Sequence, residues 1–218
     1  GSNIANVLLL MGLAAFITPI TVERRTFIRE GGVLMLATAL CLGVVLLGYL
    51  TLWMGLFLVG GLTAYIVFAY RQEQKFALAN SQNSTPSDMA TIKLPNIAFS
   101  MGLVLAGLAL TIFGAKFLVQ SAIIIAETFG VSKTIIGLTV VAIGTSLPEL
   151  TISVLAAVRG QSGLAFGNVV GSNIYNIFGI LGATAIIKPI SIPASIARID
   201  IWVMVVTTLL ILLAAKTH

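Results

Sequence analysis

A short run of residues near position 146 carries groups that coordinate hard cations. Positions 144–149 read Gly-Thr-Ser-Leu-Pro-Glu, which places a proline, two hydroxyls and a carboxylate inside an apolar stretch. Because proline has no N–H, the carbonyl of Gly144 loses its helical hydrogen-bond partner. Thr145 and Ser146 precede Glu149 by four and three residues, so the three side chains share a helix face. Carbonyl, hydroxyl and carboxylate oxygens together suit Na⁺ or Ca²⁺.

The next apolar stretch carries a second polar face. Ser172 and Asn176 are four residues apart, Asn168 lies one turn before Ser172, and Asn173 follows it. Hydroxyls and amides in membrane helices also bond to their own backbone or hold helices together. A structural role is therefore as good an explanation as a ligand role for any one of these side chains. Glu149 differs, because a carboxylate in mid-span costs on the order of 2.5–3.5 kcal/mol and is a functional candidate by default.

An internal repeat relates this second face to the start of the chain. Residues 1–20 and 171–190 are identical at ten of twenty positions, including Ser2 with Ser172 and Asn6 with Asn176. Repeats in membrane proteins commonly form two structural halves with a shared site between them. Polar residues kept in both apolar copies therefore predict that this site binds something polar.

The elements that position these residues are membrane-spanning helices. The chain of 218 residues is 58% hydrophobic and 9% charged, with a mean hydropathy of +1.09, which no soluble domain of this size matches. Apolar runs long enough to cross a membrane predict an all-α polytopic membrane protein with seven transmembrane helices. The expected spans are 4–20, 32–50, 52–70, 97–126, 135–158, 164–187 and 201–215. The single cysteine, Cys41, excludes an internal disulfide.

Basic residues orient these spans. Eight lie in the connections after the first, third and fifth spans and in the tail, and three lie on the opposite side: Arg24, Arg25, Arg29, Arg71, Lys75, Lys93, Arg159 and Lys216 against Lys133, Lys188 and Arg198. The positive-inside rule places the larger group in the cytoplasm. The two repeat copies then cross the membrane in opposite directions. The net charge of +5 follows from these connections, so we expect no nucleic-acid partner.

Several segments have simpler expectations. Residues 71–95 are polar and predict a flexible cytoplasmic linker, and residues 23–30 mix both charge signs and predict a solvated connection. Gly163, Gly167 and Gly171 form a small-residue stripe that predicts close helix packing. Ser153, a turn beyond the oxygen-rich motif, is expected to tolerate alanine with a mild effect.

These motifs resemble one family. Residues 137–149, GLTVVAIGTSLPE, followed by GNVVGSN at 167–173, are similar to an α-repeat of the sodium/calcium exchangers within the calcium/cation antiporter superfamily. The opening GSNIAN is similar to the end of the other α-repeat. The resemblance implies the inverted-repeat exchanger fold of ten helices, of which this chain resembles the third to the ninth. Residues 1–70 would then be the C-terminal part of the first half, 71–95 the linker, and 96–218 the second half.

The resemblance also implies an ion-ligand set. Glu149 matches a direct cation ligand, and Thr145 and Ser146 match hydroxyl and carbonyl ligands. Ser172 matches a serine of the following helix, and Ser2 and Asn6 match the first repeat. Asn176 stands where calcium-transporting members often have aspartate, which removes a negative charge and a protonatable group. The full set is Glu149, Thr145, Ser146, Ser172, Asn176, Ser2 and Asn6.

The resemblance implies partners as well. The transported ions would be Ca²⁺ and Na⁺ or H⁺, with no other cofactor, and the surroundings a lipid bilayer. The first repeat's own Thr-Ser-x-Pro-Glu helix has no counterpart here, so we expect the chain to be a fragment whose partners include the missing helices of the same protein. The resemblance implies an integral protein of a prokaryotic plasma (inner) membrane.

Three function classes are compatible with the residues. A secondary cation antiporter that exchanges Na⁺ for Ca²⁺ by alternating access leads, with Ca²⁺/H⁺ exchange as the alternative. A cation channel would need a continuous pore. An intramembrane hydrolase using Ser146 and Lys116 lacks a histidine in the membrane, because His218 is the only one. We therefore expect no enzymatic activity.

Overall fold

The architecture is a bundle of apolar helices. The computed structural model describes residues 1–81, 97–131, 136 and 142–216. Five helical stretches within these residues are long and apolar enough to cross a membrane, and two shorter ones, Ser2–Ile17 and Leu147–Val158, accompany them. The elements are α1 (Ser2–Ala5), the π-helical segment η1 (Asn6–Met11), α2 (Gly12–Ile17), α3 (Arg24–Leu47), α4 (Leu52–Ser81), α5 (Ile97–Thr128), α7 (Ala142–Thr145), α8 (Leu147–Val158), α9 (Ser162–Tyr175), η4 (Asn176–Leu181), α10 (Gly182–Ile187), η5 (Ile196–Asp200) and α11 (Ile201–Lys216).

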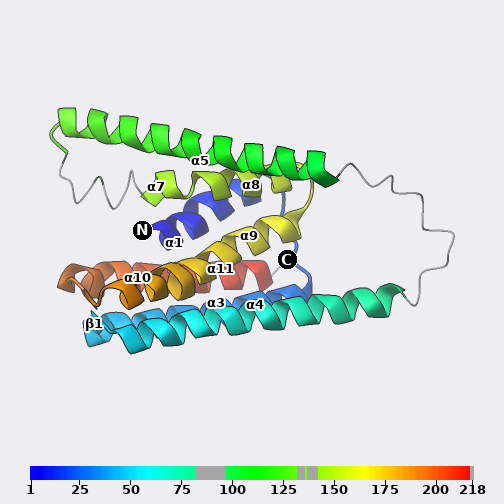
Figure 1. Ribbon diagram of the computed structural model, residues 1–218, viewed down its shortest axis with the longest axis horizontal. Helices are drawn as coiled ribbons and strands as arrows, with labels where there is room; N and C mark the ends of the chain where they lie inside the picture. Colours follow the sequence, from blue (N-terminus) through cyan, green and yellow to red (C-terminus); the bar gives the residue numbers. More distant parts are fainter. Residues whose placement is uncertain (82–96, 132–135, 137–141, 217–218) are drawn as a thin grey trace.

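Successive helical passes alternate in direction along the long axis of the molecule (Figure 1). The turns at 18–23 and 159–161 and the end of α4 lie at one end, on the right in the figure. The turns at 48–51 and 188–195 lie at the other end. This arrangement confirms the all-α polytopic prediction. The described basic connections divide between the two ends as predicted, and Lys93 and Lys133 lie outside the described residues. One feature was not predicted: the two-residue strands β1 (Tyr49–Leu50) and β2 (Ile190–Ser191) pair antiparallel at the left end.

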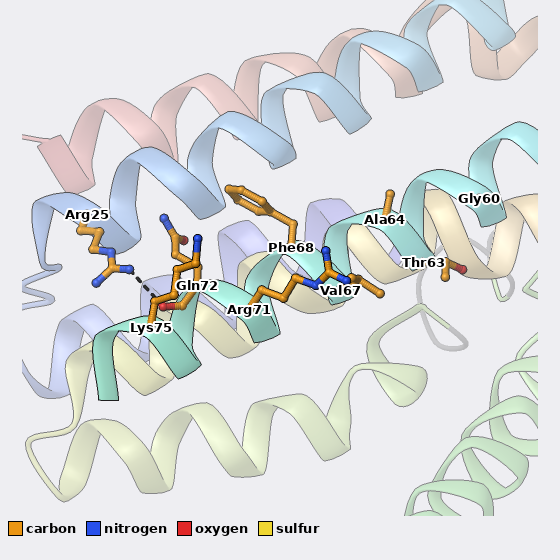
Figure 2. A pocket seen from close by; sticks show the side chains of 9 residues that line it. All are labelled: Arg25, Gly60, Thr63, Ala64, Val67, Phe68, Arg71, Gln72 and Lys75. Carbon is orange, nitrogen blue, oxygen red and sulfur yellow. Dashed lines mark hydrogen bonds between the residues drawn. The ribbon is translucent and has the colours of Figure 1, made fainter. Parts of the chain in front are cut away.

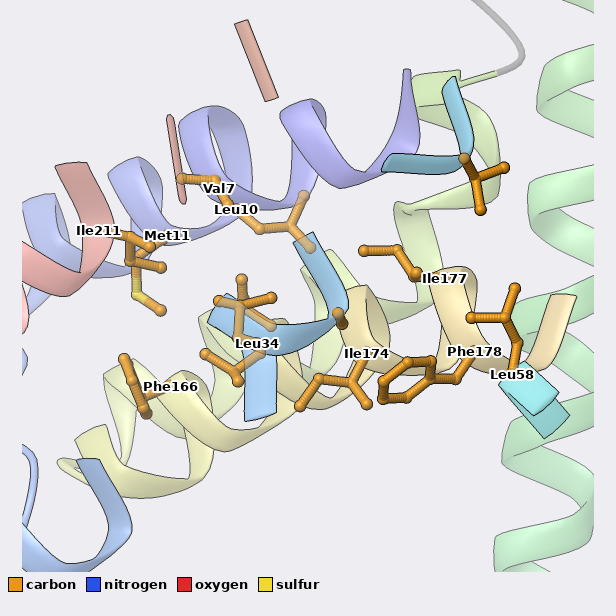
Figure 3. Packing of buried hydrophobic residues seen from close by; sticks show 14 of the residues in the cluster. Val7, Leu10, Met11, Leu34, Leu58, Phe166, Ile174, Ile177, Phe178 and Ile211 are labelled. Atoms are coloured by element: carbon orange, nitrogen blue, oxygen red, sulfur yellow. The ribbon is translucent and has the colours of Figure 1, made fainter. Parts of the chain in front are cut away.

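The apolar core lies between the repeat copies and three further helices. Side chains from η1, α3, α4, α9, η4 and α11 form one buried cluster (Figure 3). Leu10, Leu34, Phe166 and Ile174 are at most 1% exposed. Because lipid tails are as apolar as these side chains, close packing rather than burial from water drives such association. The core therefore fixes the first repeat copy against the second.

Two close backbone approaches depend on glycine. A Cβ at Gly144 would lie 1.9 Å from Cγ2 of Val119, so the absence of a side chain lets α7 pack against the long helix α5. A Cβ at Gly55 would lie 2.7 Å from the carbonyl oxygen of Gly182, where α4 crosses α10. The small-residue stripe predicted for close packing behaves differently. Added Cβ atoms at its three positions, Gly163, Gly167 and Gly171, meet no described atom within 4 Å, so that prediction is wrong.

Two predicted connections are also more ordered than expected. Helix α4 continues to Ser81, which extends it into the predicted linker, and residues 82–95 lie outside the described part. The predicted solvated connection at 23–30 instead forms the start of α3. Glu30 is only 7% exposed, because Arg29 forms an ion pair with it at 2.9 Å and the hydroxyl of Tyr65 on α4 donates to its other oxygen.

Candidate ion-binding site

The helical path breaks at Ser146. Helix α7 ends at Thr145, Ser146 has φ −93° and ψ 0°, and α8 begins at Leu147 with Pro148 in its first turn. The N–H of Ser146 donates to the carbonyl of Ile143 at 3.0 Å, a tighter turn than an α-helix makes. Proline is well tolerated at the start of a helix, where its missing N–H would have no helical partner. The predicted break beside Pro148 is confirmed.

Glu149 lies in the first turn of α8. Its Oε2 atom is buried and has no hydrogen-bond partner among the described residues. The ion pairs in the described part of the chain join Arg29 to Glu30 and Glu73, and leave Glu149 out. The N-terminus of a helix stabilises a carboxylate only modestly. An unpaired carboxylate oxygen shielded in this way is an acceptor available to a cation.

Asn168 joins α8 to α9 beside this carboxylate. Its Nδ2 atom donates to the carbonyl of Glu149 at 3.0 Å and to Oγ of Ser153 at 2.9 Å. Ser153 is fully buried. Ser153 therefore holds Asn168 beside the motif, and the expected mild effect of its alanine substitution stays a prediction. Thr151 is the better reference position, because it is exposed and its Oγ1 bonds at 3.0 Å to the carbonyl of Leu147 in its own helix.

The 170-residue repeat is reproduced in helix geometry. The first copy consists of α1, η1 and α2, and the second of the end of α9, η4 and α10. Each π-helical segment begins at an asparagine, Asn6 or Asn176. Each following α-helix ends before an extended residue, Thr18 with φ −148° or Lys188 with φ −150°. The copies run in opposite directions (Figure 1), which confirms the predicted inverted repeat. Short π-helical segments frequently mark functional sites.

Four asparagines connect the two copies, and we call them the amide clasp: Asn3, Asn6, Asn173 and Asn176. Nδ2 of Asn6 donates to Oδ1 of Asn173 at 2.9 Å, and Nδ2 of Asn176 donates to Oδ1 of Asn3 at 2.9 Å. Asn3 and Asn173 also donate to each other's backbone carbonyls, at 3.4 and 3.3 Å. Every one of these bonds has a symmetric counterpart. The clasp therefore lies on the pseudo-two-fold axis that relates the repeats.

The same axis passes through a second pair of equivalent residues. Oγ1 of Thr38 on α3 donates to Oγ1 of Thr208 on α11 at 3.5 Å, and these residues are also 170 positions apart. Both are buried. Direct contact between equivalent residues occurs only at the axis itself. The inverted repeat thus extends from the first helix through α3 and α11.

One oxygen of the clasp is left without a partner. Nδ2 of Asn6 is used in the bond to Asn173, but its Oδ1 is buried and accepts no hydrogen bond from a described residue. Two buried side-chain atoms of the described residues lack partners in this way, Asn6 Oδ1 and Glu149 Oε2. Both belong to the predicted ligand set, and the helices that carry them, η1 and α8, pack against each other. Buried polar atoms are normally satisfied, so these two exceptions are the candidate ligand atoms that the geometry favours most.

The other predicted ligands take different positions. Asn176 donates to Oγ of Ser2 at 3.4 Å, so the structure brings these two together with Asn6 in the clasp. Ser172 is half-buried on α9, one turn before Asn176. Ser146 is buried and Thr145 exposed. The prediction that the freed carbonyls near Pro148 face Ser172 and Asn176 across a polar cavity stays a prediction.

The sequence interpretation assigned no role to Asn3 and missed the role of Asn173. Both are buried, 8% and 1% exposed, and hold the amides of Asn6 and Asn176 in orientation. The signal was present, because Asn3 and Asn173 are identical positions of the repeat. The described residues contain no group of three or more His, Cys, Asp or Glu side chains that could hold a metal ion. Among the described residues, the candidate ligands are one carboxylate, that of Glu149, and neutral oxygens.

Comparisons with known proteins agree with this geometry. The family model for the sodium/calcium exchanger protein matches residues 1–71 and 99–217. The putative antiporter CaxA of Alkalimonas amylolytica is 39% identical over 98% of this chain and 66% of its own length. The sodium/calcium exchanger MaX1 of Methanosarcina acetivorans is 43% identical over 50% of this chain and 31% of its own. A solved structure of the sodium-calcium exchanger NCX_Mj superposes with a TM-score of 0.75 at 30% identity, covering 100% of this chain and 67% of that one.

The chain belongs to the sodium/calcium exchanger protein family, a family of cation antiporters. It spans about two thirds of the length of CaxA and of the NCX_Mj chain. These relatives are named as antiporters and exchangers, which places the chain among transporters.

Proposed function

We propose that the protein exchanges Na⁺ for Ca²⁺ across a membrane by alternating access. The observation that carries this proposal is the pair of buried, unpartnered oxygens, Asn6 Oδ1 and Glu149 Oε2, on two helices in contact. Carboxylate and amide oxygens are ligands for both ions. MaX1 and NCX_Mj are both named sodium/calcium exchangers, which supports the choice of ions.

In the proposed site, the predicted ligands supply different kinds of oxygen to the ion. Glu149 supplies the negative charge that replaces part of the ion's hydration shell. Asn6 and Asn176 supply amide oxygens, and each has its nitrogen engaged within the clasp. Ser2, Ser172, Thr145 and Ser146 supply hydroxyl or carbonyl oxygens beside them.

Alternating access follows from the symmetry of the repeats. Copies of opposite orientation can exchange conformations, so that the same site opens first to one side of the membrane and then to the other. The clasp, on the axis itself, is the point that this exchange leaves in place. We place residues 71–95 and the positively charged end in the cytoplasm by the positive-inside rule. An Escherichia coli relative, 32% identical over 87% of this chain, is named inner membrane protein YrbG.

Proteoliposome flux tests the proposal. Purified full-length protein should take up ⁴⁵Ca²⁺ when the vesicles are loaded with Na⁺ and diluted into Na⁺-free buffer. Uptake should stop when K⁺ replaces internal Na⁺. Uptake driven by a pH gradient without Na⁺ would instead support Ca²⁺/H⁺ exchange, and uptake without any counter-ion would indicate a channel. Either result would overturn the proposal.

A further inference from the structure

Three polar side chains form a line along one face of α9 and its continuation. Asn168, Ser172 and Asn176 follow one another at intervals of four residues, so they share one side of the helical path. The first and the last of them contact different helices. Nδ2 of Asn168 donates to α8, and Nδ2 of Asn176 donates to Asn3 of α1 at 2.9 Å. Ser172 lies between these two contacts, so the line joins the first turns of α8 to the amide clasp.

The amide of Asn168 uses both of its N–H groups. An asparagine Nδ2 atom carries two hydrogens, and here the acceptors are the carbonyl of Glu149 at 3.0 Å and Oγ of Ser153 at 2.9 Å. Both acceptors belong to the first two turns of α8. Ser153 is fully buried, which keeps water from its hydroxyl. Two bonds from one planar amide restrict both the separation and the rotation of α8 relative to α9.

Asn168 bonds to the backbone of Glu149 rather than to its carboxylate. Oε2 of Glu149 is buried and has no hydrogen-bond partner among the described residues. Contacts that orient a ligand without occupying its ligand atom commonly tune the affinity of a metal site. Such contacts also affect the choice of ion, because selectivity among hard cations depends on cavity size, ligand number and flexibility.

We propose that Asn168 is a positioning residue that sets the size of the divalent cation that the site accepts. It holds the first turn of α8, and with it the carboxylate of Glu149, at a fixed separation from Ser172 on α9. The site then fits Ca²⁺ and discriminates against the larger alkaline-earth cations, above all Ba²⁺. This role rests on the proposed function, because it requires Glu149 to be an ion ligand. Asn168 itself stays outside the ligand set.

The opposite end of α8 provides a comparison. Oγ1 of Thr18 donates to the carbonyl of Ala157 at 3.1 Å, which joins α8 to the end of α2. Ala157 lies eight residues after Glu149, or about 12 Å along the helix. Loss of this bond should affect the stability of the bundle but not the geometry around Glu149. Asn168 and Thr18 therefore separate a positioning role from a purely structural one.

Flux of the full-length protein in proteoliposomes tests the proposal. Asn168→Leu keeps the approximate size of the side chain and removes both donors. The half-saturating Ca²⁺ concentration for Na⁺-driven ⁴⁵Ca²⁺ uptake should rise by about tenfold, with the maximal rate near that of the wild type. The inhibition constant for Ba²⁺ should change much less, so the preference for Ca²⁺ narrows. Ser153→Ala leaves the bond to Glu149 in place and should shift the preference only slightly in the same direction.

Two variants serve as controls. Thr18→Val keeps the shape of the side chain and removes the hydroxyl at the far end of α8. It should lower the unfolding temperature and leave the preference for Ca²⁺ over Ba²⁺ unchanged. Gln72→Leu removes an amide from a groove along α4, none of whose lining residues belongs to α8 or α9 (Figure 2). It should leave the ion preference unchanged as well.

Asn168→Ser, whose shorter side chain cannot reach both acceptors, guards against a leucine variant that does not fold, and should show an intermediate preference. Equal weakening of Ca²⁺ and Ba²⁺, or an unchanged preference in either folded variant, would overturn the proposal. Failure of both variants to fold would assign Asn168 a structural role and overturn it too. Absence of Na⁺-driven Ca²⁺ uptake by the wild type would overturn the proposed function and this role together, whereas the other outcomes overturn this role alone.

Discussion

Two buried polar regions of this bundle differ in whether their side-chain oxygens have hydrogen-bond partners in the protein. Between α3 and α4, both oxygens of Glu30 accept hydrogen bonds, one from Arg29 at 3.0 Å and one from Tyr65. Where α8 packs against η1, Oε2 of Glu149 and Oδ1 of Asn6 are buried and accept none from described residues. Charges that the protein pairs itself hold helices together, whereas oxygens left unpaired are available to a ligand. The first region is a structural joint, and the second has the character of a binding site.

The largest effect expected from this comparison is that of Glu149→Gln. It keeps the size of the side chain but removes the charge, so Na⁺-driven ⁴⁵Ca²⁺ uptake should fall by about two orders of magnitude. Thermal stability should stay level or rise, because an unpaired buried charge disappears. Thr151→Ala, exposed on the same helix, should act like the wild type. Normal flux from folded Glu149→Gln protein would remove this residue from the site.

The opposite result is expected for Glu30→Gln. The change removes the negative charge that pairs with Arg29 and accepts a hydrogen bond from Tyr65, and it should lower the free energy of unfolding by about 1–3 kcal/mol. Flux per folded protein should stay close to that of the wild type. The matched control is Glu23→Gln, because Glu23 is exposed and has no ion pair with a described residue. Lost flux with an unchanged unfolding temperature would show that this joint takes part in transport.

The symmetry of the amide clasp predicts a matched pair of intermediate effects. Asn3→Ala and Asn173→Ala each remove the acceptor that orients one amide of the site. Loss of such orienting contacts commonly costs about tenfold in metal affinity. Both variants should therefore raise the half-saturating Ca²⁺ concentration by about tenfold in flux assays. A strong effect from one with none from the other would show that the two amides are not equivalent in function.

The smallest effect expected is that of Asn176→Asp, which adds charge where the clasp needs a donor. A carboxylate should strengthen Ca²⁺ binding, but it cannot donate to Oδ1 of Asn3 as the amide does at 2.9 Å. A protonated carboxyl can donate there, so protons should compete with Ca²⁺ at this position. The half-saturating Ca²⁺ concentration should fall a few-fold at alkaline pH and return toward the wild-type value on acidification. An affinity independent of pH would contradict this account.

Much of the fold was accessible from local pattern. Proline at position 148 predicted the break at Ser146, because a missing N–H acts on its own helix. The repeat and the basic connections predicted antiparallel copies, because the number of intervening spans fixes direction. The sequence predicted close helix packing at the glycine stripe on α9, whereas the structure shows it at Gly55, Gly182 and Gly144. Glycine spacing shows where a helix could pack closely against a neighbour, and only the tertiary structure shows whether a neighbour lies there.

The residues of the candidate site also fall into those that the sequence singles out and those whose role only the structure shows. The sequence marks Glu149, Asn6, Asn176 and Ser2 as candidate ligands, because a polar group in an apolar span or in both repeat copies is conspicuous along the chain, and their role as ligands stays a prediction. The roles of Asn3, Asn173 and Ser153 were not predictable, since each is defined by a partner on another helix.

The sequence by itself determined the membrane-spanning class, the inverted repeat and the residues that offer oxygen ligands, because hydropathy, identity and residue chemistry are properties of the chain. The tertiary structure alone decided which of those oxygens are satisfied by protein and which are left open. Nδ2 of Asn6 is engaged, whereas its Oδ1 has no partner among the described residues. Both oxygens of Glu30 are paired, whereas Oε2 of Glu149 has no described partner. The physical reason is that hydrogen-bond satisfaction depends on which helix faces meet, and spacing within one helix does not specify the face opposite.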